Sequence, residues 1–221
     1  MRGRAHYQPR GVSASGKPYT EAFVRRVHEL VGKGYAKLKP SEFCCSAEED
    51  ITGELVRAIE ALLDDIAAPQ WTRWFSVHED PRIHDAERKG KRRLRLDIRI
   101  DSSQELPRSR MRFEAKRLGQ GHGVSVYLGT DGIHCFLDGR YAREDRCAGM
   151  LGYVQKGRAD EWAAGIEQAM KADSAKLHLR SSGGWRSVRL VANLSSTYRS
   201  GHDRPSVGQP IEIFHTLLLF N

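Results

Sequence analysis

Residues 110–118, RMRFEAKRL, alternate between apolar and charged side chains. Every second position in the middle of this stretch is apolar: Met111, Phe113 and Ala115. Successive side chains of a β-strand point to opposite faces, so the apolar set can line a core while the residues between them face the other way. The stretch therefore predicts a half-buried strand that presents the acid Glu114 and the amine Lys116 side by side.

A second predicted strand carries another carboxylate on its polar face. In LRLDIRID, residues 94–101, apolar residues alternate with polar ones, and Asp97 stands among the polar set. The loop SSQELPRS separates this stretch from residues 110–118, which favours a hairpin of two consecutive strands. If the apolar faces share one core, Asp97 and Glu114 lie on the same side of the hairpin.

The remaining sequence predicts a mixture of helices and strands. Helices are expected over residues 21–38, 46–68, 143–157 and 158–177. Ser46 and Glu49 have the spacing of a capping box at the start of the second helix. Further strands are expected over residues 73–79, 124–128, 133–137, 185–196 and 211–220. This pattern predicts an α/β fold in which helices flank a β-sheet.

Length and composition indicate one well-buried domain in 221 residues, of which 39% are hydrophobic and 29% charged. No apolar run approaches the roughly 20 residues that cross a bilayer, so no membrane partner is expected. The N-terminus is basic and polar without the apolar region of a secretory signal, and we expect a cytoplasmic protein. The four cysteines lack CxxC spacing, which argues against a zinc site and a disulfide framework.

The formal charge of +8 indicates an anionic partner, and nucleic acid is the first candidate. The run RKGKRR, residues 88–93, reads as a basic turn that either grips phosphates or is only solvated. The residues expected to contact nucleic acid are Arg88, Lys89, Lys91, Arg92, Arg93 and Arg117.

The order of elements and the motif residues resemble the PD-(D/E)XK nuclease superfamily. The resemblance rests on Asp97 in RLDIRI and on Glu114 and Lys116 in FEAK, and it spans about residues 46–157. It implies a restriction-endonuclease-like fold, a mixed β-sheet core flanked by helices, and it implies that these three residues are catalytic. The sequence departs from the family motif at one position: the motif has a proline before its first acid, whereas here Leu96 precedes Asp97.

That departure leaves Asp85 and Asp101 as alternative first acids of the motif. Asp101 shares the face of Asp97 but lies at the end of the predicted strand, nearer the loop.

The resemblance also implies a divalent cation, Mg²⁺ or Mn²⁺. Its expected ligands are Asp97, Glu114, the backbone carbonyl of Ala115 and Glu54 in the preceding helix. The residues themselves favour such an ion, because two converging carboxylates repel each other unless a hard cation joins them, and Mg²⁺ prefers oxygen ligands. Lys116 is expected to hold the nucleophile or the phosphate and to offset charge in the transition state.

These features predict a metal-dependent phosphodiesterase of restriction or phage-defence type. DNA is expected as its substrate in preference to RNA, so the predicted activity is that of a DNA endonuclease. Residues 1–45 are expected to form a basic tail and an N-terminal helix extension, and residues 46–221 the nuclease domain. A homodimer or a defence-system partner protein is expected, because one active site cleaves one strand at a time.

Two alternatives stay open. One is a nuclease-like subunit that binds nucleic acid or serves in an assembly without chemistry. The other is a structural ion pair on an unrelated α/β domain, because the motif is short and matches many sequences by chance.

Overall fold

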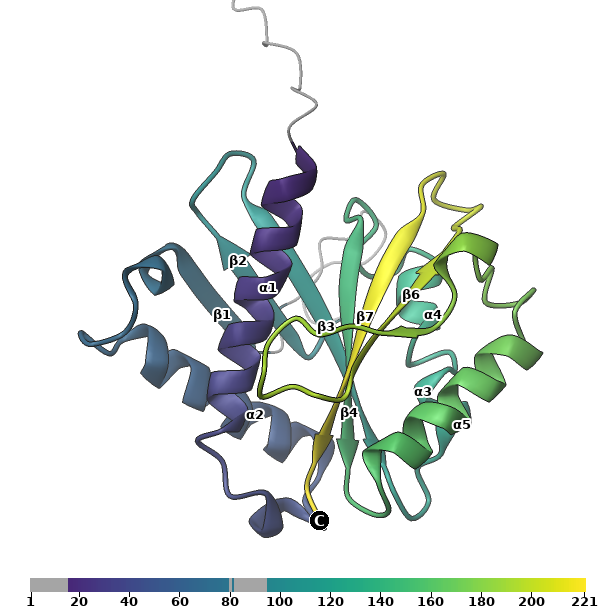
Figure 1. Cartoon of the computed structure of the whole chain (residues 1–221), viewed down its shortest axis with the longest axis horizontal. Coiled ribbons are helices and arrows are strands. Elements are labelled where there is room, and N and C mark those ends of the chain that lie inside the picture. Colours follow the sequence, from purple (N-terminus) through teal and green to yellow (C-terminus); the bar gives the residue numbers. More distant parts are fainter. Residues whose placement is uncertain (1–15, 80, 82–94) are drawn as a thin grey trace, which may run out of the picture.

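The computed structural model describes residues 16–79, 81 and 95–221, with side chains from residue 21 onward. It is an α/β domain whose seven-stranded mixed sheet carries helices on both faces (Figure 1). The strands are β1 (Phe75–Glu79), β2 (Ile98–Ser102), β3 (Ser109–Leu118), β4 (Cys147–Val154), β5 (Arg186–Ser187), β6 (Thr197–His202) and β7 (Ile211–Leu219). The α-helices are α1 (Gly16–Tyr35), α2 (Glu48–Leu63), α3 (Val124–Tyr127), α4 (His134–Leu137) and α5 (Ala159–Ala172). Three short 3-10 helices are η1 (Pro40–Phe43), η2 (Gln70–Trp74) and η4 (Ser181–Gly183).

The strand order in the sheet is β1-β2-β3-β4-β7-β6-β5. Strands β1, β2 and β3 are antiparallel neighbours, β4 lies parallel to both β3 and β7, and β6 and β5 follow in antiparallel pairing. The predicted hairpin of the two motif strands is confirmed by the pairing of β2 with β3 from Ile98↔Phe113 to Ser102↔Ser109. The predicted α/β class is confirmed as well.

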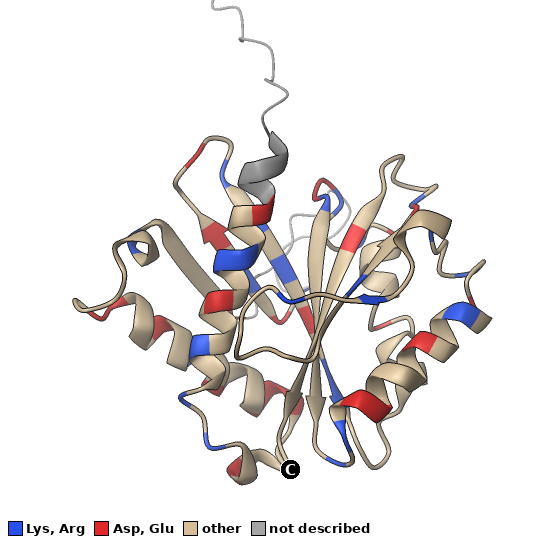
Figure 2. Cartoon of the chain, in the orientation of Figure 1, with Lys and Arg blue, Asp and Glu red and all other residues tan. Residues whose placement is uncertain are grey.

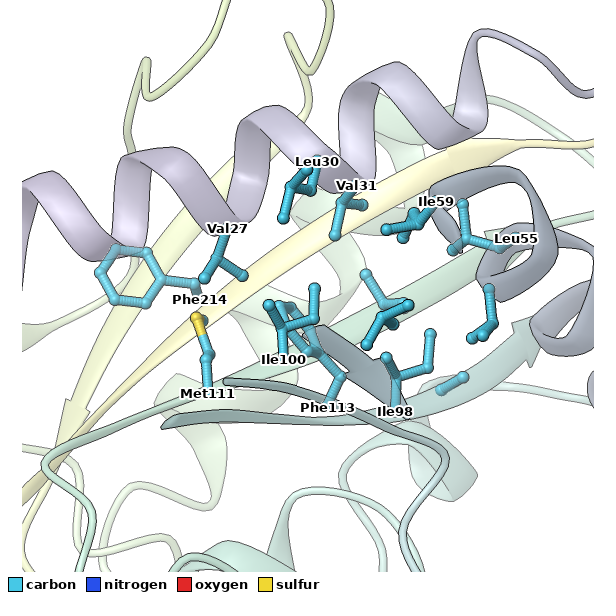
Figure 3. Packing of buried hydrophobic residues seen from close by; sticks show 14 of the residues in the cluster. Val27, Leu30, Val31, Leu55, Ile59, Ile98, Ile100, Met111, Phe113 and Phe214 are labelled. Carbon is cyan, nitrogen blue, oxygen red and sulfur yellow. The ribbon is translucent and has the colours of Figure 1, made fainter. Parts of the chain in front are cut away.

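Helices α1 and α2 cover one face of the sheet. Figure 3 shows side chains of both helices meeting apolar residues of the sheet in one cluster. The labelled members are Val27, Leu30, Val31, Leu55, Ile59, Ile98, Ile100, Met111, Phe113 and Phe214. Because α1 belongs to the segment 1–45, that segment contributes directly to the core shared by α2 and the sheet.

Helices α3, α4 and α5 pack on the opposite face around a second apolar cluster. A chain of buried polar groups ties this side together. The Ser200 hydroxyl lies 2.7 Å from His202 Nε2 and 2.8 Å from His215 Nε2. His202 Nδ1 lies 2.7 Å from the carbonyl of Leu177, and His215 Nδ1 lies 3.0 Å from the Tyr127 hydroxyl. Every ring nitrogen of the two histidines therefore has a partner, which buried polar groups require.

The helix predicted over residues 143–157 is wrong, because this segment contains the central strand β4. All eight residues of β4 are buried, so the sequence lacks the polar alternation that identifies a half-exposed strand. Gly149 and Gly152 allow neighbouring side chains to lie against the strand. A Cβ on Gly149 would lie 2.1 Å from the Phe113 ring, and one on Gly152 would lie 2.5 Å from Leu217.

Three other strand predictions are wrong in whole or in part. Residues 124–128 and 133–137 contain the short helices α3 and α4. Only Arg186–Ser187 of the stretch 185–196 is a strand, and the sheet uses Thr197–His202 instead. Short apolar runs suit either a strand or a buried helical turn, and tertiary packing decides between them.

The start of α2 also differs from its prediction. The residue that caps α2 is Ala47, and no side chain caps the helix, so the predicted capping box at Ser46 and Glu49 is wrong. At its other end α2 stops at Leu63, short of the predicted end at residue 68, and Ile66 beyond it is 95% exposed. The predicted strands over 73–79 and 211–220 and the helices over 21–38 and 158–177 are confirmed in their main parts.

Within the residues that the structure describes, none of the helices combines the length and the apolarity that a bilayer crossing requires.

The contact of Gly149 with Phe113 makes a stability prediction. Gly149→Ala should lower the free energy of unfolding by about 1–3 kcal/mol, because the added methyl group must displace a ring held between β3 and the helices. Gly184→Ala is the matched control, since no described atom lies within 4 Å of the added carbon. Its effect should stay within about 0.5 kcal/mol. Denaturant unfolding of both variants tests this, and equal effects would contradict it.

The burial of His28 predicts that acid lowers the stability of the fold. Its ring lies between Phe113 and Phe214, and burial lowers its pKa to about 4, against the opposing hydrogen bond to the Val24 carbonyl. His28 therefore becomes protonated near pH 6.5 in the unfolded chain but stays neutral at that pH in the folded chain. The free energy of unfolding falls as the pH drops below that value.

Relative to His28→Leu, the wild type should lose about 2 kcal/mol of unfolding free energy between about pH 7 and pH 5. Denaturant titrations of both proteins at the two pH values measure this difference. A difference that does not change with pH would show that His28 does not titrate as the buried geometry requires.

Candidate functional site

The site forms where β2 separates from β3. Their pairing ends at Ile98 and Phe113, and the chain bends at Asp97, just before β2 begins. The bend also interrupts the expected alternation, because Leu96 packs in the second cluster while Ile98 packs in the first. Beyond Phe113, β3 therefore continues beside β4 with one edge open to side chains rather than to a strand.

Two carboxylates bind the backbone amides of this open edge. The amide of Ala115 donates to Asp97 Oδ2 at 2.6 Å, and the amide of Arg117 donates to Glu48 Oε2 at 3.0 Å. Buried amides need partners, and hydrogen bonds to charged acceptors are stronger than those between neutral groups. Asp97 and Glu48 thus replace the hydrogen bonds that a neighbouring strand would make.

The ammonium group of Lys116 lies among three oxygen atoms. It donates to Glu48 Oε1 at 2.8 Å, to Glu114 Oε1 at 2.9 Å and to the carbonyl of Ala115 at 2.6 Å. The predicted pairing of Glu114 and Lys116 on one face of β3 is present in the structure, and both side chains are buried. Figure 2 shows the acidic first turn of α2, from which Glu48 reaches Lys116.

Burial controls the charge state of the site. It raises the pKa of Glu114 to about 8, with the nearby Asp97 carboxylate adding to the rise and Lys116 opposing it. Burial also raises the pKa of Asp97 to about 6, against the opposing amide of Ala115. For Lys116 burial lowers the pKa, but Glu114 and Glu48 outweigh burial and the net pKa is raised. The cluster therefore holds a permanent ammonium, and Glu114 is the carboxyl group whose ionised form is disfavoured at neutral pH.

One carboxylate oxygen of the site is suited to binding a small hard cation. Glu114 Oε2 is buried and has no hydrogen-bond partner among the described residues. Together with Asp97 and the Ala115 carbonyl, it provides the few protein oxygens that Mg²⁺ uses while retaining several waters. Among the residues described, no group of three His, Cys, Asp or Glu side chains converges as a full protein cage.

A loop after α4 closes the site on another side. The Tyr141 hydroxyl donates to the carbonyl of Arg95, two residues before Asp97. Burial and the nearby Glu114 carboxylate raise the pKa of this hydroxyl, so it remains a hydrogen-bond donor. The loop is itself held by the buried guanidinium of Arg204, which donates to the carbonyls of Ala142 and Asp145 at 2.9 Å each.

Of the candidate first acids, the structure brings Asp97 to Glu114. Asp101 lies opposite Arg110, at the far end of the β2–β3 ladder, where it pairs with Arg99 at 3.2 Å. Asp85 lies outside the described residues.

The helix acid at the site is Glu48 and not the predicted Glu54. Glu54 instead pairs with Arg57 at 2.8 Å on the surface of α2. The two acids differ by six positions in a helix, and only the one at the N-terminal end reaches the open edge of β3. The signal in the sequence was the acidic run Glu48–Glu49–Asp50, but choosing among its members requires the position of the helix end.

The predicted nucleic-acid contacts are only partly described. Arg88, Lys89, Lys91, Arg92 and Arg93 lie outside the described residues. Arg117 is half-buried, and its Nη1 donates to the carbonyl of Ser46 at 3.4 Å, so its guanidinium helps to hold the loop before α2.

Two polar residues at the end of β4 support α2. The Tyr153 hydroxyl lies 2.9 Å from Thr52 Oγ1, and its fully buried ring packs in the first core. Gln155 Nε2 donates to the carbonyls of Phe43 at 2.8 Å and Ser46 at 2.9 Å. Both contacts fix the N-terminal end of α2 against the central strands, which places Glu48.

No protein-family model, curated protein or solved structure matches the chain. What the site does therefore has to follow from its own geometry.

The position of Glu48 predicts unequal effects of two similar substitutions in α2. Glu48→Ala should lower the free energy of unfolding by about 1–3 kcal/mol, because it leaves the Arg117 amide and one side of Lys116 without their acceptor. Glu54→Ala is the matched control and should change it by less than about 0.5 kcal/mol, since its ion pair is exposed. Denaturant unfolding measures both, and a larger loss in Glu54→Ala would contradict the site described above.

Proposed function

We propose that this protein is a metal-dependent nuclease of the PD-(D/E)XK type. The observation that carries the proposal is the convergence of Asp97, Glu114 and Lys116 at the open edge of β3. The half-buried Asp97, the buried Glu114 and the ammonium group of Lys116 beside one open strand edge suit the cleavage of a phosphodiester, whose transition state gains negative charge on oxygen.

The arrangement of elements supports the same proposal. The antiparallel strands β1, β2 and β3 are followed by the parallel strand β4, with α2 before them and short helices between β3 and β4. The resemblance to the restriction-endonuclease-like fold rests on a helix followed by three strands, and that part of the order agrees with the structure, whereas the elements after β3 differ from those expected. The motif strands are adjacent in the sheet, and where they separate Asp97 accepts a hydrogen bond from the amide of Ala115, the residue after Glu114.

Each residue has a role in this proposal. Asp97, Glu114 and the Ala115 carbonyl would hold Mg²⁺ or Mn²⁺, which supplies an activated water and charge for the phosphate when bound. Glu48 takes the place in the site that Glu54 was expected to occupy. Lys116 would exchange one of its carboxylate partners for the scissile phosphate or the attacking water, and its ammonium would offset the charge that develops there.

Nucleic acid is the proposed substrate, since the formal charge of +8 attracts a polyanion. Of the two nucleic acids, DNA is proposed in preference to RNA. Cleavage of both strands of a duplex would need two active sites, which favours a homodimer or a partner protein. A role in restriction or phage defence is proposed from the resemblance alone.

A second candidate is a nuclease-like subunit that binds nucleic acid without cutting it. It is favoured by one observation: Lys116 already has three oxygen partners within the chain, so the same cluster can serve as a structural ion network. The two candidates differ in whether the protein cleaves nucleic acid when Mg²⁺ is present.

Cleavage of supercoiled plasmid tests the proposal. We expect nicks or breaks with Mg²⁺, none with EDTA, and a loss of about 100-fold or more in Lys116→Ala and Glu114→Gln. Lys171→Ala is the matched control, because this lysine pairs with Glu167 on the exposed side of α5. Unfolding curves of each variant show whether the fold is retained.

Full activity in a folded Lys116→Ala protein would refute the proposed site. Intact plasmid and intact RNA with every metal, together with binding that EDTA leaves unchanged, would favour the non-cutting subunit.

A further inference from the structure

Two adjacent cysteines lie in the loop between η1 and α2. Cys44 and Cys45 are both exposed, and Cys44 Sγ donates to Cys45 Sγ at 3.7 Å. This hydrogen bond is the largest of the influences that raise the pKa of the Cys45 thiol. The other two cysteines, Cys135 and Cys147, are buried in the domain.

The loop is fixed on both sides of this pair. The carbonyls of Phe43 and Ser46, the residues immediately before and after the two cysteines, both accept from the side-chain amide of Gln155. Two residues after Ser46, Glu48 binds Lys116 and the amide of Arg117. A change of backbone conformation at Cys44 and Cys45 therefore acts on the segment that positions Glu48.

We propose that Cys44 and Cys45 are a site of reversible oxidation whose state controls the position of Glu48. The reaction partner is a low-molecular-weight disulfide of the glutathione class. One cysteine thiolate attacks that disulfide and releases one thiol, and the second cysteine thiolate attacks the mixed disulfide and releases the other. Two cysteine thiols and one disulfide thus yield a Cys44–Cys45 disulfide and two small thiols.

Geometry explains why this reaction must move the loop. The Cα atoms of adjacent residues lie about 3.8 Å apart across a trans peptide, whereas disulfides usually join Cα atoms about 4.4–6.8 Å apart. Cys44 has helical backbone angles, φ −58° and ψ −21°, at the end of η1. Because the trans peptide fixes this Cα separation, a Cys44–Cys45 disulfide can close from the observed sulfur separation of 3.7 Å only if the dihedral angles of the two residues change.

The consequence follows the contacts in order. Rotation at the 44–45 peptide displaces the Ser46 carbonyl from Gln155 and Arg117, and the start of α2 moves with it. Glu48 then withdraws from the Arg117 amide and from Lys116. The effect of this on cleavage rests on the proposed function, whereas the thiol chemistry and the motion of Glu48 do not.

The test uses the full chain and glutathione disulfide as the probe. Intact-mass and peptide analysis should find the loss of two hydrogens on the peptide that contains residues 44 and 45, with Cys135 and Cys147 still reduced. Cys44→Ser and Cys45→Ser should instead each retain one bound glutathione, because no second thiol releases it. A reducing thiol should restore the original mass.

Hydrogen exchange measures the coupling without any assay of activity. In the oxidised protein the amide of Arg117 and the start of α2 should exchange about tenfold faster, as expected when a charge-assisted hydrogen bond is lost. A glutathione adduct or a cross-linked dimer in place of the internal disulfide would overturn the inference. An internal disulfide with unchanged exchange at Arg117 would overturn it as well.

The outcome is separable from that of the proposed nuclease activity. Absence of cleavage of both plasmid and RNA by the reduced protein, with every metal, refutes the nuclease and leaves the mass and exchange measurements to decide the thiol site. If cleavage is present, oxidation should reduce it in the wild type and not in Cys45→Ser.

Discussion

The open edge of β3 is the constraint on which the site depends. Where β2 turns away at Asp97, the amides of Ala115 and Arg117 are no longer paired with a strand, and buried amides must find acceptors. They find the carboxylates of Asp97 and Glu48. Satisfying the backbone in this way brings two half-buried acids to the side of a third, Glu114, which is buried.

That concentration of acids accounts for the rest of the cluster. Burial raises the pKa values of both Asp97 and Glu114 and so disfavours their ionised forms. Lys116 supplies one positive charge to Glu48 and Glu114, and Glu114 Oε2 is still left without a hydrogen-bond partner among the described residues. Perturbed pKa values of this kind occur at functional sites and also in structural ion networks.

The two cores hold the parts of the site in place from opposite faces. Helix α2 belongs to the first core and brings Glu48, while the loop after α4 belongs to the second and brings Tyr141 against the segment that contains Asp97. The end of β4 links α2 to the sheet through Gln155. Gln155 binds the loop on both sides of Cys44 and Cys45, and Glu48, which follows that loop, binds Lys116.

The sequence by itself determined the local features: the two motif strands, their pairing as a hairpin, and the common face of Glu114 and Lys116, because a period of two is written in the residues. It failed where both faces of an element are buried, as in β4, since such a strand has no polar alternation, and in short apolar runs such as residues 124–128. Only the tertiary structure decided that Glu48, and not Glu54, reaches the site, and that Asp97, and not Asp101, faces Glu114. Those choices depend on where α2 begins and where β2 leaves β3, and both are set by packing between segments that are distant in the chain.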